Sequence, residues 1–384
     1  MIPKNITISI NLIIINQIKS KIKMNFLKLI PFVMVATITI TKPALGQSKI
    51  EITIKPKVTL IEVNENKQIV NFDFLVTNSS TDTILLDQLR VSVYDNKEYL
   101  LQRKFLDNNG TAPSILLLPK RIWEGNQEQL IFNPFSEFEL VTPIHKLEYE
   151  LVFTNSKDEE TKVTTVVYPE RYNEKVALIF PLKGKILVYD AHDYNSHHRR
   201  FDYTFRPIKS FGIKSNFMRY AYDFVLLNSE NKQFKNQGEE NEDYFGFGAT
   251  VYAAAEGTVI YASNEHQDNK KFDVQKLKDN PLELYGNCIA IQHKDNTISV
   301  YGHLMHNSLT VKLGDTIHTN QSIAKIGTSG SSFFPHLHFE MRNAITHDAE
   351  GLPSYFKNIF LVEGSHKIKL NSGCATTGNI LEIK

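Results

Sequence analysis

Short stretches in which hydrophobic and polar residues alternate dominate the chain from residue 48 onward. Period-two alternation is typical of β-strands that bury one face. Seven or eight such stretches fall between residues 48 and 170, and turn residues such as Asn78-Ser79-Ser80 separate them. This pattern predicts an antiparallel sandwich of the immunoglobulin type, with a small barrel as the alternative. The same half contains no obvious cluster of titratable residues.

A second β-rich region follows, and it contains longer polar loops. Three of its strands are predicted at residues 177–182, 185–190 and 220–227. The last of them carries one carboxylate, Asp223, among apolar neighbours. Polar coil fills residues 228–243 and 266–280, and loops of this length in compact domains are usually functional. We therefore place both coils at the rim of an active cleft.

Two histidines occupy alternate positions of a further predicted strand. Apolar and polar residues alternate through residues 335–341, so His336 and His338 project from the same face. Two imidazoles placed in this way can serve as a metal ligand and a neighbouring acid or base. The pattern is short, and alone it is equally compatible with two unrelated histidines.

Six short motifs surround these histidines in a fixed order. They are GATVYAAAEGTV (248–259), YGNCIAIQH (285–293), YGHL (301–304), GD (314–315), GTSG (327–330) and HLHFE (336–340). Together they resemble the motifs of the lysostaphin/LytM-type zinc metalloendopeptidases, which cut peptidoglycan. The wider similarity covers about residues 175–365. It implies a mainly β protein whose catalytic domain is an antiparallel, duplicated hybrid motif-like β fold with Zn²⁺ as cofactor.

The resemblance also implies a set of metal ligands. The family pattern supplies a first His, an Asp four residues later and the second His of H-x-H. Asp223 and His338 stand at the second and third of these positions. Arg219 stands at the first, and a guanidinium cannot bind a metal because it stays protonated.

A histidine from the preceding loop is the candidate for the missing ligand. Residues 195–198 read N-S-H-H, and N-x-H-H followed by R-Y-A-x-D resembles a sub-branch of the family. Adjacent side chains of an extended segment point to opposite faces, so we expect only one of the pair to bind, and we favour His198 over His197. The alternatives are two solvent-exposed histidines and a domain without a catalytic metal. Arg219 is then available to pair with a carboxylate of the stem peptide.

The resemblance implies catalytic roles for two further histidines. His336 is placed to accept a proton from the attacking water, and His303 to stabilise the oxyanion or protonate the leaving amine. A structural contact with His336 is the alternative role for His303. We also expect Tyr301 to contact the substrate and Glu340 to orient a histidine from behind.

Residues 24–46 have the features of a secretory signal peptide. Lys28 precedes an apolar stretch at residues 29–40, and small residues follow it. The stretch is short for a membrane span, and a retained anchor helix is the alternative. Translation is expected to start at Met24, and the mature protein to begin near residue 47.

Composition narrows the range of partners. The chain carries 43 basic and 42 acidic side chains, and this balance gives no indication of nucleic-acid binding. A length of 384 residues accommodates two ordinary domains. Two cysteines, Cys288 and Cys374, are too few for a disulfide framework, and whether they are bridged stays open.

These features predict an exported zinc metalloendopeptidase that cleaves peptide bonds in peptidoglycan stems or cross-links. We expect the protein to be secreted or to lie in the periplasm and cell envelope. Once the signal peptide is removed, we expect no stable membrane span. The alternative is a catalytically inactive domain that binds cell wall or activates a partner hydrolase, and a general protease is a weaker one. The oligomeric state stays open. The expected domains are 1–46 (extension and signal peptide), 48–170 (sandwich), 175–365 (catalytic domain) and 366–384 (tail).

Overall fold

A computed structural model describes residues 49–384, and these belong to one compact unit. The predicted signal peptide and upstream extension lie outside the described residues. β-strands dominate, and α1 (Arg206–Lys209) is the single α-helix of the described part. No helix within residues 49–384 has the length and hydropathy that crossing a bilayer requires. The predicted mainly β fold is confirmed.

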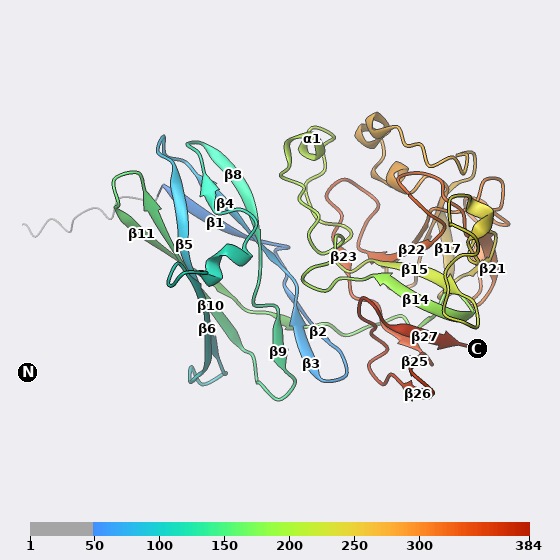
Figure 1. The fold of residues 1–384 in the computed structure, drawn as a ribbon, viewed down its shortest axis with the longest axis horizontal. Coiled ribbons are helices and arrows are strands. Elements are labelled where there is room, and N and C mark those ends of the chain that lie inside the picture. The colour runs from blue at the N-terminus through green and yellow to red at the C-terminus, as the bar shows by residue number, and fades with distance from the viewer. Residues whose placement is uncertain (1–48) are drawn as a thin grey trace, which may run out of the picture. The chain divides into compact units, whose positions relative to one another are not determined.

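Three sheets around a shared apolar core form the region up to residue 171 (Figure 1). Their strands, sheet by sheet, are β1 (Ile50–Lys55), β4 (Asp73–Asn78) and β8 (Gln127–Phe132); β11 (Glu160–Val167), β10 (Lys146–Asn155), β5 (Ile84–Tyr94) and β6 (Leu100–Asp107), with β7 (Ile122–Trp123) beside β5; and β12 (Glu170–Arg171), β2 (Leu60–Val63), β3 (Lys67–Val70) and β9 (Glu137–Glu139). Every strand pair here is antiparallel except β12 with β2, and Trp123 and Tyr149 are fully buried in the core. The region is therefore mainly antiparallel β, as predicted, and is called the sandwich below.

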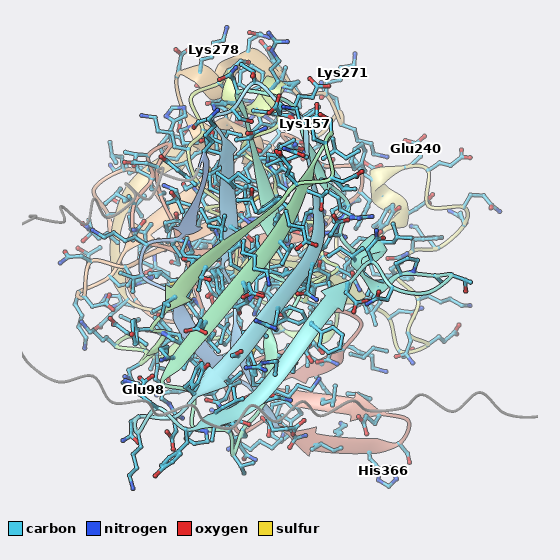
Figure 2. All side chains as sticks on the ribbon, turned by 90° about the vertical axis from the view of Figure 1, so that its left-hand side faces the viewer. Glu98, Lys157, Glu240, Lys271, Lys278 and His366 are labelled. Carbon is cyan, nitrogen blue, oxygen red and sulfur yellow. The ribbon has the colours of Figure 1, made fainter. Side chains whose placement is uncertain are left out.

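Polar turns close the hairpins of this sandwich. Glu98 lies in the turn between β5 and β6, and Lys157 lies in the turn between β10 and β11 at the opposite end of the sheet (Figure 2). The side chain of Asn155 accepts hydrogen bonds from the backbone N–H groups of Lys157 and Glu159, at 2.9 and 3.0 Å. Such side-chain-to-backbone bonds are why Asn favours turns.

An eleven-stranded sheet forms most of the region after residue 184. Its order is β20 (Thr316–Ile317), β17 (Gly257–Ser263), β18 (Cys288–Gln292), β19 (Ile298–Gly302), β22 (Leu337–Arg342), β15 (Tyr222–Leu227), β14 (Gly184–Asp190), β27 (Ile380–Ile383), β25 (Phe360–Glu363) and β26 (His366–Lys369), with β23 (Gly351–Leu352) beside β22. Two small pairs accompany it: β13 (Leu178–Ile179) with β24 (Phe356–Lys357), and β16 (Thr250–Tyr252) with β21 (Ser322–Lys325). The 3₁₀ segments are Ser114–Leu117, Asn241–Asp243, Val274–Lys278 and Pro281–Tyr285.

The end of the chain is part of this sheet. We expected residues 366–384 to form a separate tail, but they contribute β26 and β27, and β27 pairs with β14. The two cysteines are unbridged and buried.

Strand register brings polar residues of three neighbouring strands into one row. Asp190 of β14 stands opposite Asp223 of β15, and Asp223 stands opposite His338 of β22. His338 in turn stands opposite Gly302 of β19, the residue before His303. Directly opposed residues project to the same face of a sheet, so the row forms one polar strip.

Candidate active site

A cavity of about 400 Å³ lies against this polar strip. It is lined by all five histidines that the sequence selected and by Asp223, together with Tyr189, Phe201, Met218, Leu284, Tyr285, Ser331, Ser332, Phe333 and Phe334. Its size is within the range of ligand-binding pockets. The coils at residues 228–243 and 266–280, which we placed at the rim, contribute none of these residues. The histidine-rich loop at residues 191–219 lines the cavity instead, because His197 and His198, two of its three histidines, turn in toward Asp223.

Three side chains converge on one point of the cavity wall. His198, Asp223 and His338 each offer one ligand atom, and these atoms lie within 4.8 Å of one another. Asp223 Oδ1 is 3.4 Å from His198 Nε2 and 3.1 Å from His338 Nδ1. Three protein ligands of these types are the usual complement of a catalytic zinc. His198 can thus provide the third metal ligand, which Arg219 cannot provide because its side chain stays protonated.

His197 lies beside these three side chains but in a different environment. Its side chain is 62% exposed, whereas that of His198 is 2% exposed. His197 Nδ1 is 3.0 Å from Asp190 Oδ2, and its Nε2 is 3.7 Å from Asp223 Oδ2. Burial and the shorter contact to Asp223 favour His198 as the ligand.

Carboxylates support two of the three candidate ligands from behind. Asp190 Oδ2 is 3.0 Å from His198 Nδ1, and Glu340 Oε1 is 3.7 Å from His338 Nε2. A metal-binding histidine usually gives its second ring N–H to a carboxylate, which fixes the tautomer and frees the other nitrogen. His338 Nε2 is buried and has no hydrogen-bond partner, so it faces Glu340 alone. The residues present therefore fit a zinc ion.

Electrostatics keep the central carboxylate ionised. Burial raises the pKa of Asp223, but His198, His336 and His338 outweigh it and hold that pKa well below the ordinary value. Burial lowers the pKa of His338, while its hydrogen bond with Asp223 and the nearby negative charge of Glu340 raise it to about 9. Asp223 is thus an anion at neutral pH, ready to bind a cation.

The two candidate catalytic histidines have fixed rings. His303 Nδ1 lies 2.9 Å from the Ser329 carbonyl oxygen, and His336 Nδ1 lies 2.8 Å from the Phe334 carbonyl oxygen. A carbonyl only accepts, so each Nδ1 carries the proton. Nε2 of His303 can then act as an acceptor, whereas Nε2 of His336 lies 3.4 Å from Asp223 Oδ1. Burial, reinforced by His336, lowers the pKa of His303 well below its usual range, so His303 is neutral near pH 7.

Tyr301 and Arg219 do not line the cavity. Tyr301 stands opposite Phe339 and packs in the core on the other face of the sheet, where its hydroxyl accepts a hydrogen bond from the Ala254 N–H at 2.7 Å. Strand alternation explains this position, because Phe339 and His338 point to opposite faces. The guanidinium of Arg219 is fully buried against a carboxylate of the sandwich. Neither residue makes the expected substrate contact from these positions.

Two arginines form ion pairs with Asp73 of β4, a residue that the sequence analysis did not select. Arg199 donates from Nη1 to Asp73 Oδ1 at 2.5 Å, and Arg219 donates from Nη1 to Asp73 Oδ2 at 2.6 Å. Arg199 also bonds the Asn71 side chain and the Phe72 carbonyl, and Asp73 and both arginines are fully buried. This "arginine clamp" (Asp73, Arg199, Arg219) attaches the loop of His198 to the sandwich.

Asp190 was also missed, although a signal for it exists. The buried positions of β14 are Ile186, Val188 and Asp190, so the carboxylate continues the buried face of an alternating strand. An acid at such a position is a candidate for a site because a buried charge needs a partner. The same rule could have selected Asp73, which begins β4 and is fully buried.

Comparison with known proteins supports the resemblance. Residues 242–349 match the model of Peptidase family M23. The chain is 32% identical over 114 residues to Murein hydrolase activator NlpD of Salmonella dublin and 28% identical over 99 residues to Cell division protein DipM of Caulobacter vibrioides. These alignments cover 29% and 26% of this chain but only 25% and 13% of the two relatives.

Solved structures of the same type are also similar. The catalytic domain of the antimicrobial peptidase lysostaphin from Staphylococcus simulans matches 34% of this chain and 74% of its own, with 23% identity and a TM-score of 0.23. The predicted family resemblance is confirmed, because residues 242–349 match the model of Peptidase family M23.

Proposed function

We propose that this M23 domain is a zinc endopeptidase that hydrolyses peptide bonds in peptidoglycan stems or cross-links. The observation that carries the proposal is the convergence of His198 Nε2, Asp223 Oδ1 and His338 Nδ1 beside two histidines whose rings are held through Nδ1 by carbonyl oxygens. A domain that only binds cell wall needs neither a metal-ligand set nor free bases. Zinc bound by these three residues would polarise the scissile carbonyl and activate a water molecule.

Two histidines of the cleft can carry out the proton transfers of the proposed hydrolysis. His336 Nε2 lies 3.4 Å from Asp223 Oδ1, next to the proposed ligands, and can take the proton of the attacking water. His303 is neutral and its ring centroid is 4.8 Å from that of His336, so it can donate toward the oxyanion or leaving amine only after accepting a proton. The ring of Phe334 packs against that of His336, with their centroids 5.0 Å apart, and so helps to orient this histidine in the cleft.

A second candidate function is activation of a partner hydrolase without catalysis. It is supported by the similarity to Murein hydrolase activator NlpD, which covers only 29% of this chain. Either function requires export to the cell wall, and the signal-like residues 24–46 support that location.

Digestion of purified sacculi separates the two functions. The wild-type chain is expected to release soluble peptides, detected by mass spectrometry, and His336→Ala is expected to lose release about 100-fold or more while it keeps its zinc. His266→Ala, which removes a histidine outside the cavity, is the matched control. No release by the wild type, combined with equal stimulation of a partner hydrolase by wild type and His336→Ala, would establish the activator function instead.

A further inference from the structure

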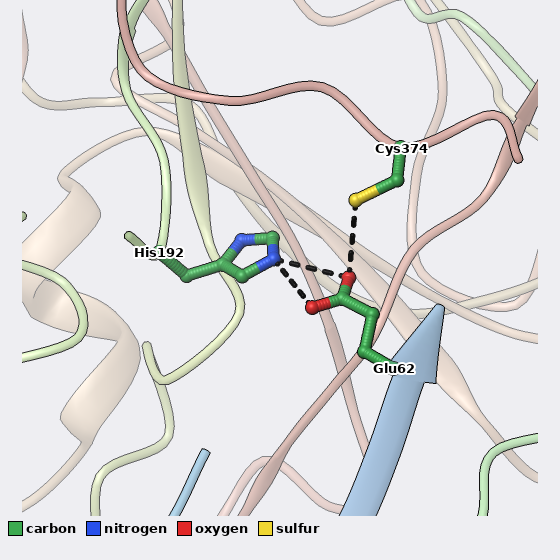
Figure 3. A group of neighbouring side chains, drawn as sticks. All are labelled: Glu62, His192 and Cys374. Atoms are coloured by element: carbon green, nitrogen blue, oxygen red, sulfur yellow. Dashed lines mark hydrogen bonds and ion pairs between the residues drawn. The ribbon is translucent and has the colours of Figure 1, made fainter. Parts of the chain in front are cut away.

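A second group of metal-binding residue types lies outside the cleft. Glu62, His192 and Cys374 come from β2, from the loop after β14 and from the segment before β27, and Figure 3 shows them facing one another. One ligand atom from each lies within 4.8 Å of the others, as in the cleft. None of the three takes part in the proposed hydrolysis.

The distances between these donors approach those of a coordination shell. His192 Nε2 is 3.0 and 2.9 Å from the two oxygens of Glu62, and Cys374 Sγ is 3.3 Å from Glu62 Oε1. With Zn–N and Zn–O bonds near 2.1 Å and Zn–S near 2.3 Å, the ligand atoms of a tetrahedral zinc are about 3.3 to 3.6 Å apart. A movement of a few tenths of an ångström therefore opens space for the ion.

Burial and charge also suit a divalent cation. Glu62, His192 and Cys374 are 0%, 3% and 4% exposed. A carboxylate and a thiolate neutralise a divalent ion, so the loaded cluster buries no net charge, which limits the cost of burial. The Tyr222 hydroxyl lies 3.7 Å from Sγ and can donate a hydrogen bond to the thiolate.

A small void beside the cluster leaves a place for a fourth ligand. It has a volume of about 10 Å³, and both His192 and Cys374 line it. This volume is close to the minimum that one water molecule needs. Three protein ligands and a water complete a tetrahedral shell, and a thiolate in the set favours zinc over magnesium or calcium.

We propose that Glu62, His192 and Cys374 form a second, structural zinc site that ties the sandwich to the M23 domain. Binding removes the proton of the Cys374 thiol and any proton on His192 Nε2 to solvent, and it forms Zn–S, Zn–N and Zn–O bonds. Without metal, the imidazole and the thiol both donate hydrogen bonds to the Glu62 carboxylate.

Cobalt substitution distinguishes this site from the cleft. The cleft offers only nitrogen and oxygen ligands, so a thiolate-to-cobalt charge-transfer band in the near ultraviolet reports the second site alone. The full-length mature chain, stripped of metal and titrated with Co²⁺, is expected to bind two ions and to show the band. Cys374→Ser is expected to bind one ion and to lose the band. Cys288→Ser, which alters a buried thiol elsewhere, is expected to keep both.

Two further variants make the result independent of folding defects and of the proposed hydrolase. His192→Gln keeps an N–H donor for Glu62 but loses the ligand, so it is expected to lose the band in a folded chain. His338→Ala is expected to lose one ion and keep the band. A wild-type chain without the band, or a band that survives in both Cys374→Ser and His192→Gln, would overturn the second site, whatever the cleft then does.

Discussion

His198 and Arg199 are neighbours in the chain, yet they enter two buried polar clusters of opposite character. Every nitrogen of the Arg199 guanidinium donates a hydrogen bond to residues 71–73 of the sandwich. In the cleft, by contrast, the His303 ring is held through Nδ1 alone, and Nε2 of His336 lies 3.4 Å from Asp223 Oδ1. The difference teaches that a guanidinium with every nitrogen bonded holds structure, whereas an imidazole with an unbonded nitrogen beside a carboxylate is prepared for chemistry.

The largest expected effect is the loss of a cleft ligand. His198→Ala is expected to weaken zinc binding in the cleft by more than about 100-fold, because losing a ligand exceeds the 10–100-fold cost of losing a supporting residue. His197→Ala, at the adjacent exposed position, is expected to change it little. Zinc titration of both variants provides the test, and equal losses would remove the contrast between the two histidines.

Breaking the arginine clamp is expected to affect stability next. Asp73→Ala leaves two buried guanidinium groups without their shared partner, and breaking a buried pair costs about 3–5 kcal/mol. Glu137→Ala removes an exposed ion pair with Lys67 and is expected to cost less than about 1 kcal/mol. Urea unfolding of the two variants measures both values. A clamp that costs no more than the surface pair would contradict its structural role.

Glu350, next to the arginine clamp, makes the stability of the fold depend on pH. Its carboxylate is 3.8 Å from Arg219 Nη2, and burial outweighs that arginine and raises the pKa of Glu350 to about 7. A carboxyl whose pKa is raised on folding stabilises the fold below its unfolded pKa, near 4.3, and this stability is lost as pH rises through about 7.

The free energy of unfolding is therefore expected to fall by up to about 3 kcal/mol between about pH 4.5 and pH 8, relative to Glu350→Gln. Urea unfolding across this range measures the difference. Parallel curves for the wild type and the variant would show that Glu350 stays ionised beside Arg219.

The smallest expected effect comes from the carboxylate behind His198. Asp190→Asn keeps the size of the side chain but removes its charge, and loss of such a support typically lowers metal affinity 10–100-fold. Asp158→Asn changes an exposed turn residue in the same way and is expected to leave zinc binding unchanged. An Asp190→Asn chain with wild-type affinity would mean that burial alone orients His198.

The sequence predicted what local pattern and motif determine. Alternation revealed the sandwich, and the H-x-H spacing placed His336 and His338 on one face, where both line the cavity. Strand alternation could have predicted that Asp190 is buried. It could not have predicted that Asp190 lies opposite Asp223, because that pairing depends on strand register over more than thirty residues. Arg219 and Tyr301 were misplaced for a related reason. A motif does not reveal that the side chain of Tyr301 points to the other face of the sheet. Nor does it reveal that Asp73, far away in the sequence, binds Arg219.

The pairing of β27 with β14 links residues that are roughly 200 positions apart, and closing so long a loop is slow compared with forming a hairpin. While the ribosome is still adding residues 191–380, the outer edge of β14 has no neighbour. The sheet that carries Asp190 and Asp223 is thus completed only after nearly all of this sequence has been translated.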